Sequence, residues 1–223
     1  MKTKKGDFIE LIYTGYLMDG TVFDTNDETV AKTQALDSSN LKPLRFKQGT
    51  GFVVKGFDDA IVDKEIGKEY EVELEPEQAF GKRSKDLVRL VPLTKFYEHK
   101  LNPVVGLQVE INGRLGTVKS VTGGRVLVDF NHPLAGRKVK YDFKITKLFE
   151  NLDDKLNIVL EMILGKPAKS MKQDGEVLSI ELDIDLNDEV KEHLIKEINK
   201  YLPELNEKKL ELKSTKAGDT KKN

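Results

Sequence analysis

Hydrophobic and polar residues alternate along the first part of the chain in the manner of β-strands. Residues 7–18 are rich in β-branched and aromatic side chains and predict a strand. The dipeptide Asp19-Gly20 is typical of a tight turn, and residues 21–24 predict the return strand of a hairpin. Residues 25–43 are polar throughout and predict a long loop, which at this length is usually either a functional flap or a mobile loop.

The alternation resumes after this loop in shorter elements. Residues 44–46 predict a strand, and the apolar spacing within residues 51–66 predicts a short helix that Gly67 closes. Residues 69–74 predict a further strand, which Glu75-Pro76 stops. The first region therefore combines several strands with one short helix.

The middle of the chain carries the pattern of a small antiparallel sheet of its own. Residues 107–111 and 114–118 flank Asn112-Gly113, a strong short-range signal for a hairpin. Residues 125–130 predict a third strand of this sheet. Residues 138–145 alternate again, and we expect that strand to pair with strands of the first region.

The remaining residues combine helical and strand periodicity. Two amphipathic helices are predicted, one with Asp153 as its N-cap and one beginning near Asp188. Residues 176–185 alternate as a strand, and the leucine spacing that ends at Leu212 predicts a last short strand. We expect the tail from Lys213 to be frayed.

Composition excludes several classes of function. The 223 residues include 34% charged side chains, yet 37 Lys and Arg against 38 Asp and Glu leave a formal net charge of -1. That balance gives no support to general attraction to nucleic acid or to anionic membranes. The absence of cysteine excludes disulfides and thiolate chemistry. Without a long apolar run or a signal peptide, we expect no membrane span and a cytoplasmic location.

The residues that usually carry catalysis are sparse. His99 and His193 read as surface residues, whereas His132 lies where the small sheet returns to the first region and could border a binding site. No two histidines have metal-ligand spacing. The glycines of Gly49-Thr-Gly51 and Gly123-Gly124 match neither a phosphate loop nor a dinucleotide fingerprint. We therefore expect no metal and no cofactor.

Four segments in order give the chain a specific resemblance. The segment Ile12-Tyr-Thr-Gly-Tyr-Leu-Met-Asp-Gly-Thr-Val-Phe-Asp24 closely resembles the opening signature of FKBP-type peptidyl-prolyl isomerases. Val53-Val-Lys-Gly-Phe57 is similar to the second motif of that family, and Ala79-Phe-Gly81 to the third. Val139-Lys-Tyr-Asp-Phe-Lys-Ile145 resembles its closing strand. The four matches cover about residues 5–81 and 134–148.

The rest of the chain resembles particular branches of the family. The insertion after Gly81, which ends in Asn131-His-Pro-Leu-Ala-Gly136, is similar to the insert-in-flap domain of the SlyD-like branch. The long flap before Phe46 and the extra carboxy-terminal region resemble archaeal long-type members.

The resemblance implies an α+β fold with three modules. Residues 1–83 and 134–151 would form the isomerase domain, an FKBP-like antiparallel β half-barrel with a short helix. Residues 84–133 would form a small all-β insert-in-flap chaperone domain. Residues 152–223 would form a carboxy-terminal α+β domain, which either packs on the isomerase or pairs with a second copy. We prefer the homodimer, because symmetric pairing is the commonest way to close open sheet edges.

The resemblance also implies a site. Its members would line an apolar pocket with a polar rim, and they are Tyr13, Phe23, Asp24, Phe46, Val53, Val54, Phe57, Phe80, Leu134 and Tyr141. Phe57 would be the floor, where most relatives carry Trp, and Tyr13 would hold the rim carboxylate of Asp24. The backbone N–H of Val54 would bind a substrate carbonyl. Phe80 stands where Tyr is common, so one hydroxyl donor is missing and tight binding of macrolide inhibitors is in question.

The function implied is rotation of X–Pro bonds in unfolded or nascent polypeptides, combined with chaperone activity. This reaction breaks no bond, so it agrees with a chain that lacks thiols and metal motifs. An alternative from a different class is a non-catalytic holdase that uses the same apolar surfaces only to shield unfolded chains. Neither interpretation needs a nucleic acid or a membrane as partner.

Overall fold

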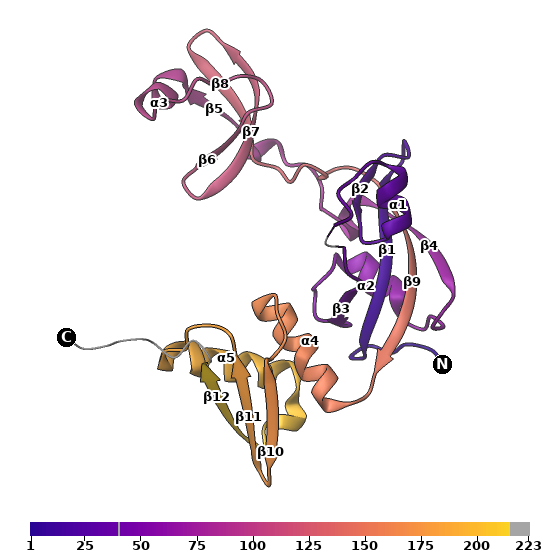
Figure 1. Ribbon diagram of the computed structural model, residues 1–223. Coiled ribbons are helices and arrows are strands. Elements are labelled where there is room, and N and C mark those ends of the chain that lie inside the picture. The colour runs from indigo at the N-terminus through magenta and orange to yellow at the C-terminus, as the bar shows by residue number, and fades with distance from the viewer. Residues whose placement is uncertain (40, 215–223) are drawn as a thin grey trace, which may run out of the picture. The chain divides into compact units, whose positions relative to one another are not determined.

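A computed structural model describes residues 1–39 and 41–214. The chain divides into two compact units, one formed by Met1–Val72 with the chain from Lys140 onward and the other by Glu73–Val139 (Figure 1). Within these residues, no helix is both long and apolar enough to cross a membrane.

The first unit is built on a five-stranded sheet. The order β2-β1-β9-β4 joins Val22–Thr25, Phe8–Leu17, Val139–Phe149 and Glu69–Leu74, and β3 (Leu44–Lys47) also pairs with β1. The pairs of β1 with β2 and with β3 are antiparallel. The predicted hairpin is confirmed, and so is the pairing of the strand near residues 138–145 with strands of the first region.

Alternation along these strands creates the core of the sheet. Ile9 and Leu11 on β1 and Phe143 and Ile145 on β9 are buried, as period-2 side chains on one face should be. The short helix α2 (Lys55–Ile61) contributes buried Phe57 and Ile61. This helix ends at Ile61, so the prediction that Gly67 closes it was wrong.

The polar segment 25–43 contains a helix that the pattern did not predict. Helix α1 (Glu28–Thr33) begins after Asp27, whose side chain accepts hydrogen bonds from the backbone N–H groups of Thr29 and Val30. Only Ala31 of this helix is buried. A helix with one buried residue leaves almost no apolar period in the sequence, which is why the segment resembled a loop.

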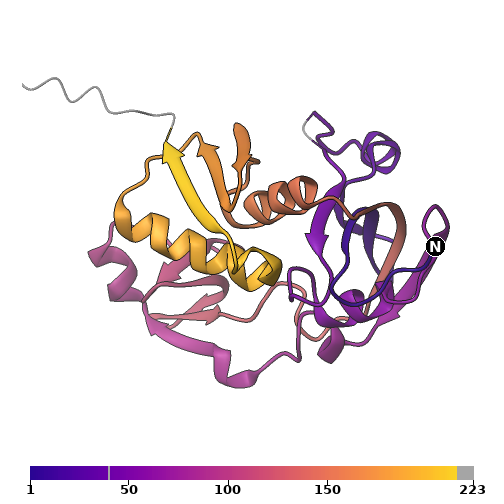
Figure 2. The same cartoon turned by 90° about the horizontal axis from the view of Figure 1, so that it is seen from below.

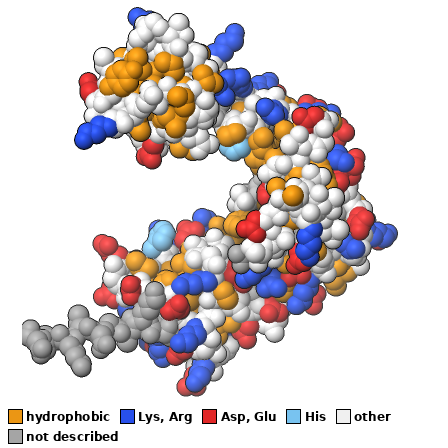
Figure 3. Space-filling model, turned by 45° about the horizontal axis from the view of Figure 1, so that its top comes forward, with side chains coloured by type: hydrophobic (Ala, Val, Ile, Leu, Met, Phe, Trp, Pro, Cys, Tyr) orange, Lys and Arg blue, Asp and Glu red, His pale blue; other side chains and the backbone are white. Residues whose placement is uncertain are grey.

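The second unit holds a four-stranded antiparallel sheet in the order β5-β8-β7-β6. The strands are Val88–Pro92, Arg125–Asp129, Arg114–Thr122 and Gln108–Ile111. The prediction that this unit is purely β was wrong. Helix α3 (Leu93–Glu98) follows β5 and buries Phe96 against the sheet. The short helices η1 (Pro76–Gln78) and η2 (Lys85–Leu87) precede β5. Hydrophobic side chains are also exposed on the surface of the second unit, at the top of Figure 3.

The carboxy-terminal part of the first unit alternates helices and strands. Its elements are α4 (Leu152–Leu164), β10 (Ser170–Asp174), β11 (Val177–Leu182), α5 (Asp188–Tyr201), η3 (Pro203–Leu205) and β12 (Lys209–Ser214). The cap of α4 is Asn151, not the predicted Asp153. Both helices pack on the buried leucine and isoleucine face of β11 and β12 (Figure 2). Lys213 and Ser214 belong to β12, and the rest of the predicted frayed tail lies outside the described residues.

This carboxy-terminal part packs against the isomerase-like sheet. Phe8 of β1 and Phe149 of β9 are buried in the same apolar cluster as Leu156 and Leu160 of α4. Phe8 alternates with Ile9, so it lies on the face of the sheet opposite the core. The Lys47 ammonium on β3 donates to the Tyr201 carbonyl at the end of α5, at 2.6 Å.

Candidate active site

Three aromatic rings pack together in the first unit at the predicted floor of the site. Phe57 in α2 and Tyr141 in β9 stack with ring centroids 4.3 Å apart and planes 10° apart. Phe143, two residues along β9, meets Phe57 edge-on at 5.3 Å. Phe57 and Tyr141 are 1% and 5% exposed, so these rings are shielded from water.

A hydrogen-bonded tyrosine and carboxylate lie beside this floor. The Tyr13 hydroxyl on β1 donates to Oδ2 of Asp24 on β2 at 2.7 Å, and the Tyr13 ring lies 5.8 Å from that of Phe57. Burial, the hydrogen bond to Asp24 and the charge of Asp24 together raise the pKa of Tyr13 above its ordinary value. Burial and the charge of Asp24 also raise the pKa of Tyr141. Both hydroxyls therefore remain protonated at neutral pH, and the Tyr13 hydroxyl is the donor to Asp24.

The side chain of Asn26 fixes Tyr13 in place. Its Oδ1 accepts from the backbone N–H of Tyr13 at 2.7 Å, and its Nδ2 donates to the Leu11 carbonyl at 2.9 Å. Thr14 and Thr25 bond to each other through their hydroxyls at 2.8 Å. These bonds tie β1 to the end of β2, and sequence reasoning missed Asn26 because its partners are distant in the chain.

Gly15 makes room for the ring of Phe23. A Cβ atom at Gly15 would lie 2.5 Å from Cζ of Phe23, closer than real carbon contacts allow. Phe23 in turn meets Tyr141 edge-on at 5.7 Å. A side chain at position 15 would therefore displace one of the rings that border the site.

The loop before α2 contributes the other apolar side chains. Val53 and Val54 are half-buried, and the Val54 carbonyl accepts from the N–H groups of Phe57 and Asp58. Val54 thus begins the helix, and its own N–H is not used by the first helical turn. Phe46 has no exposed surface and stacks on Phe52 at 5.9 Å, so it supports the wall from behind.

Two residues of this region were not predicted. Phe52 is 43% exposed beside Val53, so an aromatic face is open to solvent there. Asp58 is buried, and both of its carboxylate oxygens accept from the backbone N–H of Gly49, at 2.9 and 3.0 Å. This bond fastens the loop between β3 and α2.

Two predicted site residues belong to the second unit. The Phe80 ring stacks on His132 with centroids 4.6 Å apart and planes 3° apart. Nδ1 of His132 accepts from the N–H of Leu134 at 3.2 Å. His132 therefore contacts both Phe80 and Leu134, while His99 and His193 are exposed.

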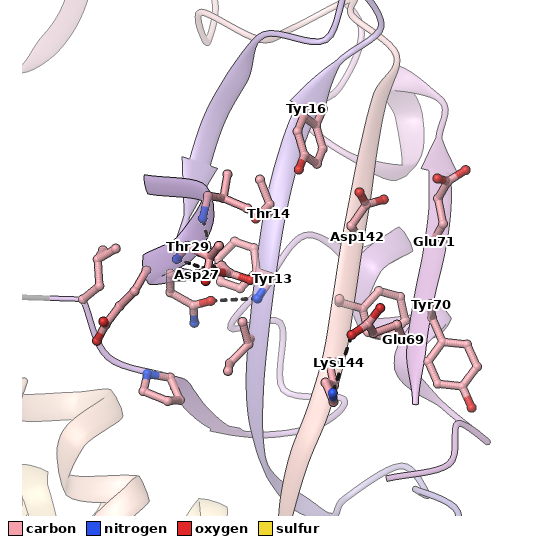
Figure 4. A pocket seen from close by; sticks show the side chains of 17 residues that line it. Tyr13, Thr14, Tyr16, Asp27, Thr29, Glu69, Tyr70, Glu71, Asp142 and Lys144 are labelled. Atoms are coloured by element: carbon pink, nitrogen blue, oxygen red, sulfur yellow. Dashed lines mark hydrogen bonds and ion pairs between the residues drawn. The ribbon is translucent and has the colours of Figure 1, made fainter. Parts of the chain in front are cut away.

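A hollow of about 760 Å³ lies against the sheet. Its lining includes Thr14 and Tyr16 of β1 and Asp142 and Lys144 of β9, together with Tyr13 and Phe143. Figure 4 shows these side chains and the ion pair of Lys144 with Glu69. Among the described residues, no group of three or more His, Asp or Glu side chains could hold a metal ion.

Two family models match the chain. The model described as FKBP-type peptidyl-prolyl cis-trans isomerase matches residues 1–92, and the one described as the IF domain of FKBP26 matches residues 89–134. Together they include the segments that hold Tyr13, Asp24 and Phe57.

Named relatives cover much of the same region. The short-type peptidyl-prolyl cis-trans isomerase of Methanocaldococcus jannaschii is 33% identical over 144 residues, which is 64% of this chain and 91% of that protein. SlyD of Treponema pallidum is 31% identical over 133 residues, 57% of this chain and 74% of its own. The 16 kDa FKBP-type isomerase of Escherichia coli is 30% identical over 115 residues, which is 49% of this chain and 76% of that protein. With this similarity and the site geometry, the chain belongs to the FKBP-type peptidyl-prolyl cis-trans isomerases, in their SlyD-like branch.

Proposed function

We propose that the site around Phe57 rotates X–Pro bonds in unfolded or partly folded polypeptides by desolvating the imide and favouring its twisted form. The barrier to rotation is about 18–20 kcal/mol and comes mostly from amide resonance, which polar solvent sustains. Lowering it by about 4 kcal/mol would give roughly a thousandfold acceleration. The main support for the proposal is the Tyr13–Asp24 hydrogen bond beside the stacked Phe57 and Tyr141 rings.

Each predicted residue has a role in this proposal. Phe57 is the floor, and the side walls are Tyr13, Phe23, Val53, Val54 and Tyr141, with Phe46 supporting them. Asp24 is exposed at the rim, where it orients the Tyr13 hydroxyl and polarises the site. The Val54 N–H binds a substrate carbonyl. Phe80 and Leu134 belong to the second unit, and their proposed role is to offer apolar surface to the polypeptide.

A proline-peptide assay tests the catalytic role of Asp24. Asp24→Ala should lower kcat/KM for a short X–Pro peptide about tenfold or more, because a bond between the Tyr13 hydroxyl and a charged acceptor is lost. Asp154→Ala, an exposed carboxylate at the start of α4, is the matched control and should leave the rate unchanged. If wild type gave no acceleration at all, only the holdase interpretation would remain.

We propose that residues 84–133 form an insert-in-flap domain that binds unfolded chains and presents them to the isomerase site. Its surface exposes several large apolar side chains: Leu90 (58%), Tyr97 (57%), Leu101 (45%), Val104 (56%), Val105 (69%) and Leu115 (63%). Exposed apolar groups gathered on a small unit are typical of a binding surface. Suppression of aggregation of an unfolded protein, measured by light scattering, should weaken in Leu90→Ser/Val105→Ser.

We further propose that residues 152–223 act both as a support for the isomerase domain and as the contact between two copies. β10 and β12 are the two ends of the order β10-β11-β12, and an end strand can pair with another chain. A light-scattering mass near twice 25.2 kDa at micromolar concentration would support the dimer. A mass near 25.2 kDa would refute it.

A further inference from the structure

The apolar hollow of the second unit is bordered by positive charge. It has a volume of about 940 Å³, and its apolar lining includes Leu90, Val91, Phe96, Leu101, Ile111 and Phe130. Arg89 on β5, Lys95 on α3 and Arg114 on β7 also line it, against one carboxylate, Glu110 on β6. Figure 3 shows orange and blue side chains together on this part of the molecule.

The charge is specific to this segment of the chain. Residues 84–133 contain seven Lys and Arg and four Asp and Glu, whereas the whole chain is balanced at 37 against 38. One of the four acids, Asp129, is already paired with Arg83. Within the described residues, Lys95 and Arg114 have no carboxylate within ion-pair distance, so these charges are available to a ligand.

From this charge, and given the proposed binding of unfolded chains by this unit, we propose that the hollow selects apolar segments flanked by Asp or Glu. The apolar lining takes up the hydrophobic run, and Arg89, Lys95 and Arg114 attract carboxylates at its ends. An extended chain advances about 3.3 Å per residue, and exposed charges act over roughly 8–10 Å at physiological salt. The acids must therefore lie within about three residues of the run.

The size of the preference follows from the exposure of the charges. Each exposed ion pair multiplies affinity only a few times, since solvent screens it. Two or three such pairs give an expected preference of about five- to tenfold for an acid-flanked segment over a lysine-flanked one. The preference should come largely from faster association and should fall with added salt.

Two synthetic peptides measure this preference directly. Both carry the same proline-free apolar run, one flanked by two Asp on each side and the other by two Lys, and binding to the full-length protein is followed by fluorescence anisotropy. We expect Kd to be about five- to tenfold lower for the Asp-flanked peptide at 20 mM salt, and the difference to shrink below twofold at 500 mM. Equal affinities, or tighter binding of the Lys-flanked peptide, would overturn the charge preference and leave the chaperone proposal standing.

Paired variants identify the charges responsible. Lys95→Gln/Arg114→Gln should abolish the preference and leave binding of the Lys-flanked peptide unweakened. Lys85→Gln/Lys119→Gln removes the same charge from exposed positions of this unit outside the hollow, and it should keep the preference. An equal loss in both double variants would refute a role for the hollow, because only the net charge would then matter.

Two further outcomes are decisive. If neither peptide binds at either salt concentration, the chaperone proposal fails and the charge preference fails with it. A 12-nucleotide single-stranded DNA serves as a polyanion without an apolar run. Binding of this DNA as tight as that of the Asp-flanked peptide would show general anion attraction and overturn the proposal of an apolar, acid-flanked ligand.

Discussion

At the scale of single residues, the shape of the site depends on a glycine as much as on its aromatic rings. Gly15 lies on β1, two residues after Tyr13, whose hydroxyl binds Asp24. The pairing of β1 with β2 becomes irregular between Gly15 and Tyr16. Because Gly15 lacks a Cβ, the ring of Phe23 can lie over β1 and reach Tyr141. The absence of a side chain at Gly15 thus allows a ring from β2 to contact Tyr141.

Gly15→Ala tests this arrangement. The added carbon would lie 2.5 Å from Phe23, and overpacking of this kind typically costs about 1–3 kcal/mol unless the neighbour moves. Phe23 is only half-buried, so we expect its ring to swing away. The rate on a proline peptide should fall several-fold with less than about 1.5 kcal/mol lost in unfolding free energy by denaturant titration.

A double-mutant cycle shows whether the effect passes through Phe23. In the Phe23→Ala background, Gly15→Ala should have little further effect on rate, since the colliding ring is gone. Additive losses would mean that the alanine acts through the backbone of β1 instead.

The contacts among these residues show what the sequence could reveal. The ordered motifs placed Tyr13, Asp24, Phe57 and Tyr141 in one site, and the structure brings those four together. The role of Gly15, the two bonds from Asp58 to Gly49 and the exposed face of Phe52 were not predicted. Each depends on a long-range contact or on the path of a loop, and neither leaves a periodic signal in the sequence.

At the scale of elements, strong periodicity decided which predictions succeeded. The strand predicted at residues 69–74 coincides with β4, and α5 begins at the predicted Asp188. The missed elements are α1, α3, β5 and β10. They are five or six residues long, and they face solvent except at one or two positions that pack on the rest of the fold. In addition, α3 follows β5 without a loop. Tertiary packing rather than local pattern forms such elements.

One cluster of hydrogen bonds within the second unit joins the segment before β5 to the end of β8 and the residues after it. Oδ1 of Asp129 accepts from the backbone N–H and the side-chain Nδ2 of Asn131, at 3.0 and 2.7 Å, and Oδ2 pairs with Arg83. Asn131 in turn binds the N–H and the carbonyl of Ser84, at 2.8 and 2.9 Å. Burial alone would raise the pKa of Asp129, but the bonds from Asn131 and the charge of Arg83 outweigh burial and lower it.

This cluster should make the second unit sensitive to acid. Because the pKa of Asp129 is lower in the folded state, its contribution to stability is complete above the unfolded pKa of about 3.9 and is lost as pH falls through the folded pKa. We expect amide hydrogen exchange in β5 and β8 to accelerate below about pH 4. Asp129→Asn should accelerate it already at pH 7 and flatten the pH dependence.

The exposed Asp86 of the same unit is the matched control for this prediction. Asp86→Asn should leave both the exchange rates at pH 7 and their pH dependence unchanged. If Asp129→Asn kept the wild-type acid response, another carboxylate would be responsible.

At the scale of the whole chain, the back of the isomerase sheet supports the carboxy-terminal part. Phe8 is 3% exposed and packs with α4, while the ammonium groups of Lys47 and Lys155 lie 5.4 and 6.0 Å from its ring. Arg45 pairs with Glu10 at 2.8 Å and also approaches Glu161 of α4 at 4.0 Å. Phe8 and Phe149 therefore join the back of the sheet to the apolar core of the carboxy-terminal part, while Ile9 lies in the core on the opposite face.

Phe8→Ala should uncouple these parts. Loss of a buried phenylalanine typically costs about 3–5 kcal/mol, and here the cavity would lie between β1 and α4. We expect faster hydrogen exchange in β3 and α4 together and a lower Tm. Phe8 lies on the face opposite Tyr13, so the rate on a short proline peptide below the Tm should change less than twofold. Met18→Ala, at an exposed position on the same hairpin, should change none of these measurements.

Removal of the inserted segment separates catalysis from client binding. The N–H of Gly136 donates to the Gly81 carbonyl at 2.8 Å, so the two chain segments at the base of the insertion are already adjacent. A variant that lacks residues 84–132 can therefore be closed by a short linker.

This deletion variant should keep the rate on a short proline peptide within about threefold, because the Tyr13, Asp24 and Phe57 contacts lie outside the deletion. Catalysis of proline-limited refolding of a protein should fall about tenfold or more, since the exposed apolar side chains that would hold the client are gone. The double variant Leu90→Ser/Val105→Ser keeps the insertion in place and should also lower refolding catalysis. Equal losses on peptide and protein in the deletion variant would contradict a binding role for the insertion.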